Sequence, residues 1–123
     1  MAAVAFPLTD ELTSSIEYTM RQVRQSLVQV RNGHAGAGAG IILSPEGRIL
    51  TNNHVLGNSR GGHHVILRDS EGGLQAEVLV CDPDVDLAIL RIEQYGLPGA
   101  SIGDSRHLQV GQLVFAIGHP WRS

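Results

Sequence analysis

The sequence GAGAGIILSPEGRILTNNHV, residues 36–55, contains most of the features that decide the fold. Ile41–Leu43 and Arg48–Thr51 are short apolar runs that suit β-strands. The four residues between them, Ser44-Pro45-Glu46-Gly47, place proline and glycine where a tight turn needs them. The segment therefore predicts a β-hairpin whose second arm ends just before His54.

The same pattern of short apolar runs separated by turn residues continues along the chain. Val65–Arg68 and Ala76–Val80 flank Ser70-Glu71-Gly72-Gly73, which predicts a second hairpin. Further strands are expected at Ala88–Ile92 and Leu113–Ile117. Several short strands at this spacing predict an all-β sandwich or barrel.

One helix is predicted near the N-terminus. Its apolar residues recur three or four positions apart, at Leu12, Ile16, Met20, Val23 and Leu27. Thr9 is the expected N-cap, and Asp10 and Glu11 then lie at the positive end of the helix dipole. Near Ser26 the pattern changes to strand-like alternation that runs to Arg31, and Leu27 fits either element.

Composition excludes several classes of protein. The 123 residues suit one domain, and 42% hydrophobic with 17% charged residues excludes wholesale disorder. A net charge of −3 without a basic cluster argues against a nucleic-acid partner. The single cysteine, Cys81, excludes an internal disulfide. No apolar run approaches the roughly 18 residues of a membrane span, and Met1–Pro7 lacks the charged start of a secretory signal.

Three segments together indicate a function. The first ends in Thr-Asn-Asn-His-Val at residue 55, the second is Asp-Pro-Asp-Val-Asp-Leu-Ala-Ile-Leu at 82–90, and the third runs from Ile-Gly-Asp-Ser to Ala-Ile-Gly-His-Pro at 102–120. In this order they resemble the HtrA/Deg family of trypsin-like serine proteases over roughly residues 26 to 122. The resemblance implies an all-β, trypsin-like Greek-key barrel, the N-terminal barrel of a two-barrel protease fold, preceded by a short helix.

The resemblance also implies a division of the chain and the roles of two side chains. Residues 1–25 would be the helical segment, 26–99 the barrel, and 100–123 the crossover and first strand of a second barrel. His54 would be the catalytic general base, and Asp86 would accept the Nδ1 proton of its imidazole. Asp82, Asp84 and Asp86 share strand parity, so periodicity cannot choose among them; the motif selects Asp86, with Asp84 as the alternative.

The nucleophile of the family is not found in this stretch. In the family it lies in a Gly-Asn-Ser-Gly-Gly motif beyond the Ala-Ile-Gly-x-Pro segment, and this sequence stops at Ser123. Gly57-Asn58-Ser59-Arg60-Gly61-Gly62 is similar, but Arg60 interrupts it, and Ser59 is expected to belong to a polar connecting loop. Ser101, Ser105 and Ser123 have no motif around them. The chain on its own is therefore expected not to hydrolyse peptides.

No cofactor or metal is expected. The glycines at positions 36, 38 and 40 lack the spacing and the lysine of a phosphate loop, and they are expected instead to let the first hairpin pack closely. His63 and His64 are adjacent and would point to opposite faces of a strand, and no pair of ligands has zinc spacing.

The resemblance implies unfolded or exposed polypeptides as substrates of the whole protein, and an extracytoplasmic (periplasmic) or membrane-tethered location. An unpaired apolar strand at residues 113–117 would favour a homo-oligomer or a strand-swapped form. The alternative function is a non-catalytic pseudo-protease or split-lobe module that binds other proteins.

Overall fold

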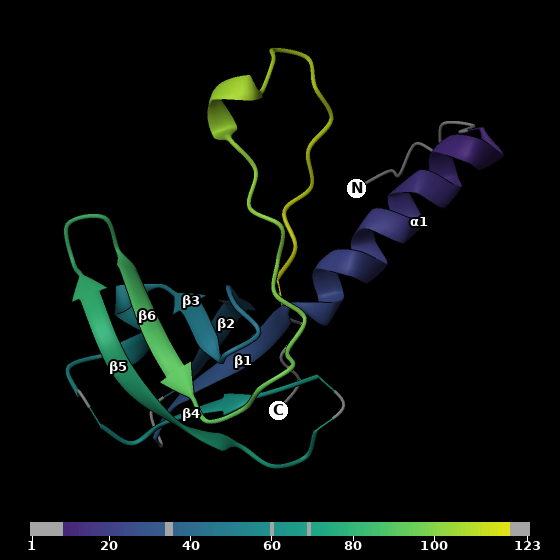
Figure 1. Ribbon diagram of the computed structural model, residues 1–123. Helices are drawn as coiled ribbons and strands as arrows, with labels where there is room; N and C mark the ends of the chain where they lie inside the picture. Colours follow the sequence, from purple (N-terminus) through teal and green to yellow (C-terminus); the bar gives the residue numbers. More distant parts are fainter. Residues whose placement is uncertain (1–8, 34–35, 60, 69, 119–123) are drawn as a thin grey trace, which may run out of the picture.

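The computed structural model describes residues 9–33, 36–59, 61–68 and 70–118 (Figure 1). In chain order its elements are α1 (Asp10–Gln25), β1 (Leu27–Asn32), β2 (Gly36–Ile42), β3 (Arg48–Thr51), α2 (Asn53–Leu56), β4 (His63–Ile66), β5 (Leu74–Asp82), β6 (Leu87–Ile92) and the 3₁₀ turn η1 (Ser105–His107). The strands lie inside the range 26–99 that was expected for the barrel.

The six strands of the described residues form one closed antiparallel barrel in the order β1-β2-β3-β6-β5-β4. The hairpins β2–β3, β4–β5 and β5–β6 join sequential strands, whereas β3 pairs with β6, as in a Greek key. The barrel closes where β1 pairs with β4, with Val30 opposite Val65. The expected all-β Greek-key barrel is confirmed.

The barrel interior is filled by alternate residues of every strand. Val28 and Val30 of β1 and Ala88, Leu90 and Ile92 of β6 show this period of two, because successive side chains of a strand point to opposite faces. The complete buried cluster consists of Val28, Val30, Ile42, Ile49, Leu56, Val65, Ala76, Ala88, Leu90, Ile92 and Leu97. Short aliphatic side chains dominate this core, as a narrow six-stranded barrel requires.

Helix α1 begins and ends where the sequence predicts. The Thr9 hydroxyl accepts a hydrogen bond from the Leu12 N–H at 3.2 Å, and Ser26 is the C-cap, so Leu27 belongs to β1. The helix extends away from the barrel, and none of its residues is buried (Figure 1). Its apolar stripe is therefore left without a partner in the described part of the chain.

The segment after β6 is anchored to the barrel at its beginning and then leaves it. The Ser26 hydroxyl donates to the Pro98 carbonyl at 2.8 Å, and the Ala100 N–H donates to the Ile42 carbonyl at 2.8 Å. Beyond this point the chain runs outward through η1 and returns (Figure 1).

Three sequence predictions about strands need correction. The residues at 113–117 form no strand in the described structure: Leu113, Val114 and Phe115 are exposed. A strand needs a neighbour to pair its N–H and C=O groups, and no strand edge of the described barrel lies beside this segment. β4 starts at His63, two residues before the predicted start, because His63 pairs with Asn32 of β1. The glycine-rich residues 36–40 are part of β2.

Candidate functional site

His54 is carried by the short helix α2, which follows β3 directly. Thr51 ends β3, and its buried hydroxyl donates to the Ala39 carbonyl at 2.8 Å, which ties this end of β3 to β2. Leu56 is fully buried and anchors α2 in the barrel. The His54 imidazole lies on the other side of the helix, where 72% of the side chain is exposed. Four residues are too few to produce a helical period, so α2 could not be predicted from the sequence.

Glycine at position 38 provides the space in which α2 sits. A Cβ added there would lie 2.5 Å from a methyl group of Val55. The Val55 side chain therefore packs directly on the backbone of β2. The same is true deeper in the barrel at Gly40, where a Cβ would crowd Ile49 and Val30. The small residues of β2 therefore allow the close packing expected from the sequence, and at Gly38 they also position the helix that carries His54.

Asp86 lies in the turn between β5 and β6, immediately before Leu87 begins β6. Within this turn the Asp84 N–H donates to the Asp82 carboxylate at 2.9 Å, an Asx turn that reverses the chain. Asp86 itself has φ of 55° and is the only residue other than glycine with positive φ in the described ranges. Aspartate tolerates this left-handed conformation better than most residues do.

The structure brings His54 and Asp86 together. His54 Nδ1 is 2.6 Å from Asp86 Oδ2, and the His54 backbone N–H donates to Oδ1 at 2.8 Å, so both carboxylate oxygens are used by one residue. Of the three aspartates of the motif, Asp86 makes this contact, whereas Asp82 is occupied by the turn.

The charge of Asp86 decides which nitrogen of the neutral His54 imidazole carries the proton. The hydrogen bond from the His54 ring, and next the one from its backbone N–H, hold the pKa of the Asp86 carboxyl below its ordinary value of 3.8. Asp86 is therefore ionised at neutral pH and can only accept hydrogen bonds. A neutral His54 must then carry its proton on Nδ1, which leaves the Nε2 lone pair free to take a proton from another group.

The other sequence candidates do not join this pair. The Ser59 hydroxyl donates to the Gly61 carbonyl at 2.8 Å within its own loop, as expected of a connecting residue. Ser101 and Ser105 are exposed, and Ser123 lies outside the described residues. In the ranges that the structure describes, no three His, Cys, Asp or Glu side chains are grouped as metal ligands would be, and no helix has the length and apolarity needed to cross a membrane.

The adjacent histidines of β4 point to opposite faces, as their parity predicted. His63 is fully buried, with Nε2 3.0 Å from the Ser59 carbonyl, and His64 is exposed. His63 thus joins the start of β4 to the loop that follows α2.

One residue at the site was not recognised from the sequence. The Asn52 side chain, through Nδ2, donates to the backbone carbonyl of Asp86 at 2.9 Å. The two residues are 34 positions apart, and nothing in the local pattern identifies which carbonyl that side chain reaches. A polar residue at a strand end beside the motif histidine was the only available signal.

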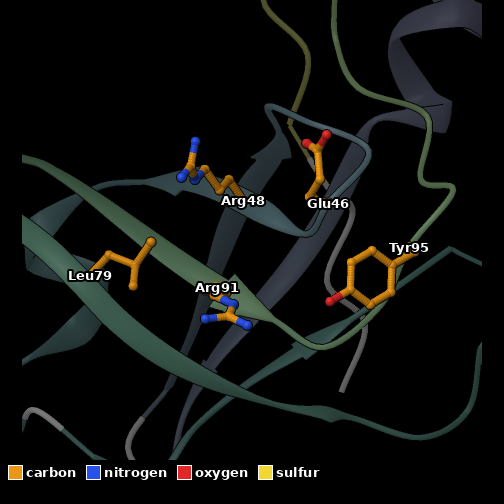
Figure 2. Close-up of a pocket in the computed structure, with 5 residues that line it drawn as sticks. All are labelled: Glu46, Arg48, Leu79, Arg91 and Tyr95. Carbon is orange, nitrogen blue, oxygen red and sulfur yellow. The ribbon is translucent and has the colours of Figure 1, made fainter.

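A groove of about 580 Å³ lies on a different face of the barrel, across β3, β5 and β6. Figure 2 shows the side chains that line it, Glu46, Arg48, Leu79, Arg91 and Tyr95. It includes neither His54 nor Asp86. The pair therefore lies outside this groove, at an edge of the barrel where both side chains are exposed to solvent.

We expect Gly38→Ala to destabilise the barrel by about 1–3 kcal/mol, the usual cost of overpacking, and to move His54 away from Asp86. The new methyl group collides with Val55. Urea unfolding followed by circular dichroism measures the loss. Adding Val55→Ala should recover most of it; if the double variant is no more stable than Gly38→Ala, the packing explanation is wrong.

The pair should also stabilise the folded chain near neutral pH and make that stability fall in acid. Because the pKa of Asp86 is lower in the folded state than its ordinary value of 3.8, its contribution is complete above that value and is lost as the pH falls through the folded pKa. Asp86→Asn removes this contribution. Between about pH 5 and pH 3, the melting temperature of the variant should therefore fall less than that of the unmodified chain. It should still fall, because Asp104, whose pKa is lowered by Arg106, titrates in both proteins. If the melting temperatures of the unmodified chain and of Asp86→Asn fell in parallel with pH, this contribution of Asp86 would be contradicted.

Comparisons with known proteins agree with the geometry. The sequence pattern of the family described as "Trypsin-like peptidase domain" matches residues 38–123. A protein of Chlamydia pneumoniae, described as "Probable periplasmic serine endoprotease DegP-like", is 44% identical over 84 residues, which are 68% of this chain and 17% of the relative. A protein of Pseudomonas putida (strain GB-1) with the same description is 42% identical over 85 residues. These residues are again 68% of this chain and 17% of the relative.

A solved structure is similar as well. The crystal structure of the serine endoprotease from Yersinia pestis superposes with a TM-score of 0.69 at 26% identity and covers 87% of this chain and 38% of that one. The chain thus spans 17% of the length of these two curated relatives.

Proposed function

The chain belongs to the trypsin-like peptidase family, in its HtrA/Deg group of serine endoproteases, and from this premise we propose that it is the N-terminal lobe of a peptide-bond hydrolase with His54 and Asp86 as two members of its catalytic triad. The observation that carries the proposal is the 2.6 Å contact between His54 Nδ1 and Asp86 Oδ2 at an exposed edge of the barrel. We also keep the division into 1–25, 26–99 and 100–123 as part of this proposal.

The geometry suits general base catalysis. His54 Nε2 would take the proton of a serine hydroxyl as its oxygen attacks the peptide carbonyl carbon, and the resulting imidazolium would then donate that proton to the leaving amine. Asp86 would hold the imidazole in the tautomer with Nδ1 protonated and stabilise the imidazolium charge. Water would release the acyl group by the same two proton transfers, which regenerates both side chains.

The nucleophile is proposed to come from outside these 123 residues. No serine lies in a Gly-Asn-Ser-Gly-Gly motif, and the similar stretch at Ser59 is closed within its own loop. The chain alone is therefore proposed to be inactive. A fluorophosphonate probe, which modifies activated serines, should leave it unlabelled, and stoichiometric labelling of any serine would disprove this part of the proposal.

The relatives suggest substrates and a location. Their descriptions as periplasmic serine endoproteases support polypeptides as substrates of the whole protein and an extracytoplasmic location. Unfolded or exposed segments of polypeptides are the substrates that we propose. The direct test is a chimera in which residues 1–118 replace the corresponding part of a DegP-like protease that supplies the nucleophile. The proposal predicts hydrolysis of unfolded casein. A folded but inactive chimera would instead favour a lobe that only binds proteins.

Exposed apolar surface supports self-association of the isolated chain. Strand pairing aligns a row of four apolar residues on the outer face of the barrel, namely Ile41, Leu50, Ile89 and Val80. The segment beyond the barrel adds exposed Ile102, Leu108, Leu113, Val114 and Phe115. Exposed apolar side chains of this kind favour association between molecules.

We therefore expect dimers or larger species at micromolar concentration in size exclusion with light scattering. Val80→Arg and Val114→Arg, tested separately, should each reduce the associated fraction if their surface takes part. A clean monomer for the unmodified chain would contradict the expectation.

A further inference from the structure

We propose that Asn52 is a positioning residue, whose side-chain amide holds the turn before β6 so that Asp86 presents its carboxylate to His54. The catalytic meaning of this role rests on the proposed function. The geometric claim stands on the contacts between Asn52, Asp86 and His54 alone.

The conformation of Asp86 requires external support. Its φ of 55° lies in the left-handed region, which is unfavourable for an L-residue. The Cβ direction depends on this angle, so relaxation to a right-handed conformation would swing the carboxylate away from the imidazole. The backbone of Asp86 must therefore be fixed before its side chain can be aligned.

Asn52 supplies that fixation at the backbone. Asn52 Nδ2 bonds to the Asp86 carbonyl, whereas both His54 contacts are made to the Asp86 carboxylate. The three hydrogen bonds come from residues 52 and 54, so the start of α2 holds the main chain and the side chain of Asp86 together. Without Asn52, only the contacts made to the carboxylate, by His54 and by the backbone of Asn53, would remain, on a turn free to relax.

The orientation of Asn52 argues against an ordinary capping role. It occupies the N-cap position of α2, where an asparagine side chain normally accepts a hydrogen bond from the second or third N–H of the helix. Here it makes no such bond and points its amide to Asp86 instead. Serine or aspartate can also cap a helix, but the serine hydroxyl is too short for this reach and the aspartate carboxylate has no proton to donate, so the bond to the carbonyl needs the amide.

This difference between capping and positioning defines the test. Asn52→Ser keeps a good N-cap and adds no charge, but its hydroxyl is too short to reach Asp86. Asn52→Leu has nearly the shape of asparagine and no donor. Asn58→Ser, in the exposed loop after α2, is the matched control. Each variant of the 123-residue chain is isotopically labelled for NMR, which needs no turnover.

In the unmodified chain and in Asn58→Ser, the His54 Nδ1 proton should give a separate downfield resonance, and the Asp86 side-chain carbon should titrate below its ordinary pKa of 3.8. In Asn52→Ser and Asn52→Leu, the exchange of that proton should be at least about tenfold faster, or its resonance should be lost, because the hydrogen bond opens more often. The pKa of Asp86 should also rise toward 3.8. If the exchange rate of the His54 Nδ1 proton and the pKa of Asp86 are unchanged in Asn52→Ser, Asn52 acts only as an N-cap and the proposal is wrong.

A measurement on the unmodified chain keeps the inference testable if both variants fail to fold. The Asn52 side-chain amide protons should exchange with water several times more slowly than those of the exposed Asn58, because one of them is hydrogen-bonded. Equal exchange rates would overturn the proposal. An inactive chimera with intact NMR signatures would disprove the protease function and leave the positioning role standing.

Discussion

Replacing His54 by alanine in the active chimera is expected to reduce casein hydrolysis by about 10⁴–10⁶-fold, mainly through kcat. The imidazole is the group of the pair that removes the proton from the serine, since the lowered pKa of the Asp86 carboxyl makes its carboxylate too weak a base. Asp86→Asn should cost about 10⁴-fold, because an amide no longer enforces the tautomer with Nδ1 protonated.

The matched control is His64→Ala, which removes an exposed imidazole from β4. It should leave hydrolysis within about twofold of the unmodified chimera, as expected for a surface substitution away from the site. If His54→Ala retained more than a tenth of the activity, the assignment of His54 as the general base would be wrong. The double variant with Asp86→Asn should be little worse than His54→Ala alone, because the two side chains act as one unit.

Gly47→Ala is expected to destabilise the barrel by about 3–5 kcal/mol, a large part of the total stability of about 5–15 kcal/mol that is usual for a domain. Gly47 closes the β2–β3 turn with φ of 98°, which only glycine adopts easily. A Cβ there would also collide with the Ile92 carbonyl oxygen. The Gly47 carbonyl accepts a hydrogen bond from the Ile92 N–H at 2.9 Å, so this collision cannot be relieved without breaking the contact.

Gly96→Ala separates strain from collision. Gly96 has φ of 70°, but a Cβ there would meet nothing within 4 Å. Its expected cost is therefore the strain alone, about 1 kcal/mol. Urea unfolding followed by circular dichroism compares the two variants, and equal losses would show that the approach of Ile92 to Gly47 has no energetic importance.

Much of this molecule was predictable from local sequence. The apolar residues of α1 and its cap at Thr9 predicted the helix to within one residue, because both signals act over a single turn. The second arm of the first hairpin was predicted at Arg48–Thr51 with both ends correct, since Pro45 and Gly47 define the turn before it. His54 and Asp86 were selected by their motif, and the structure places them in contact.

Other features required the folded chain. The pairing of β3 with β6 and of β1 with β4 joins residues far apart in sequence, and it is decided by which arrangement buries the aliphatic core. The same closure leaves α1 without a buried residue, although the helix carries an apolar stripe, and it offers no strand edge to residues 113–117.

The sequence by itself determined helix α1, the presence of the six barrel strands and the chemical identity of the pair at positions 54 and 86, because turn residues, side-chain period and motif order are local properties. Only the tertiary structure decided that Asp86 adopts a left-handed conformation, that Asn52 bonds to its carbonyl, and that Gly38 makes room for α2. These contacts join distant segments at distances of a few ångströms, and such distances follow from the closure of the barrel and not from any pattern along the chain.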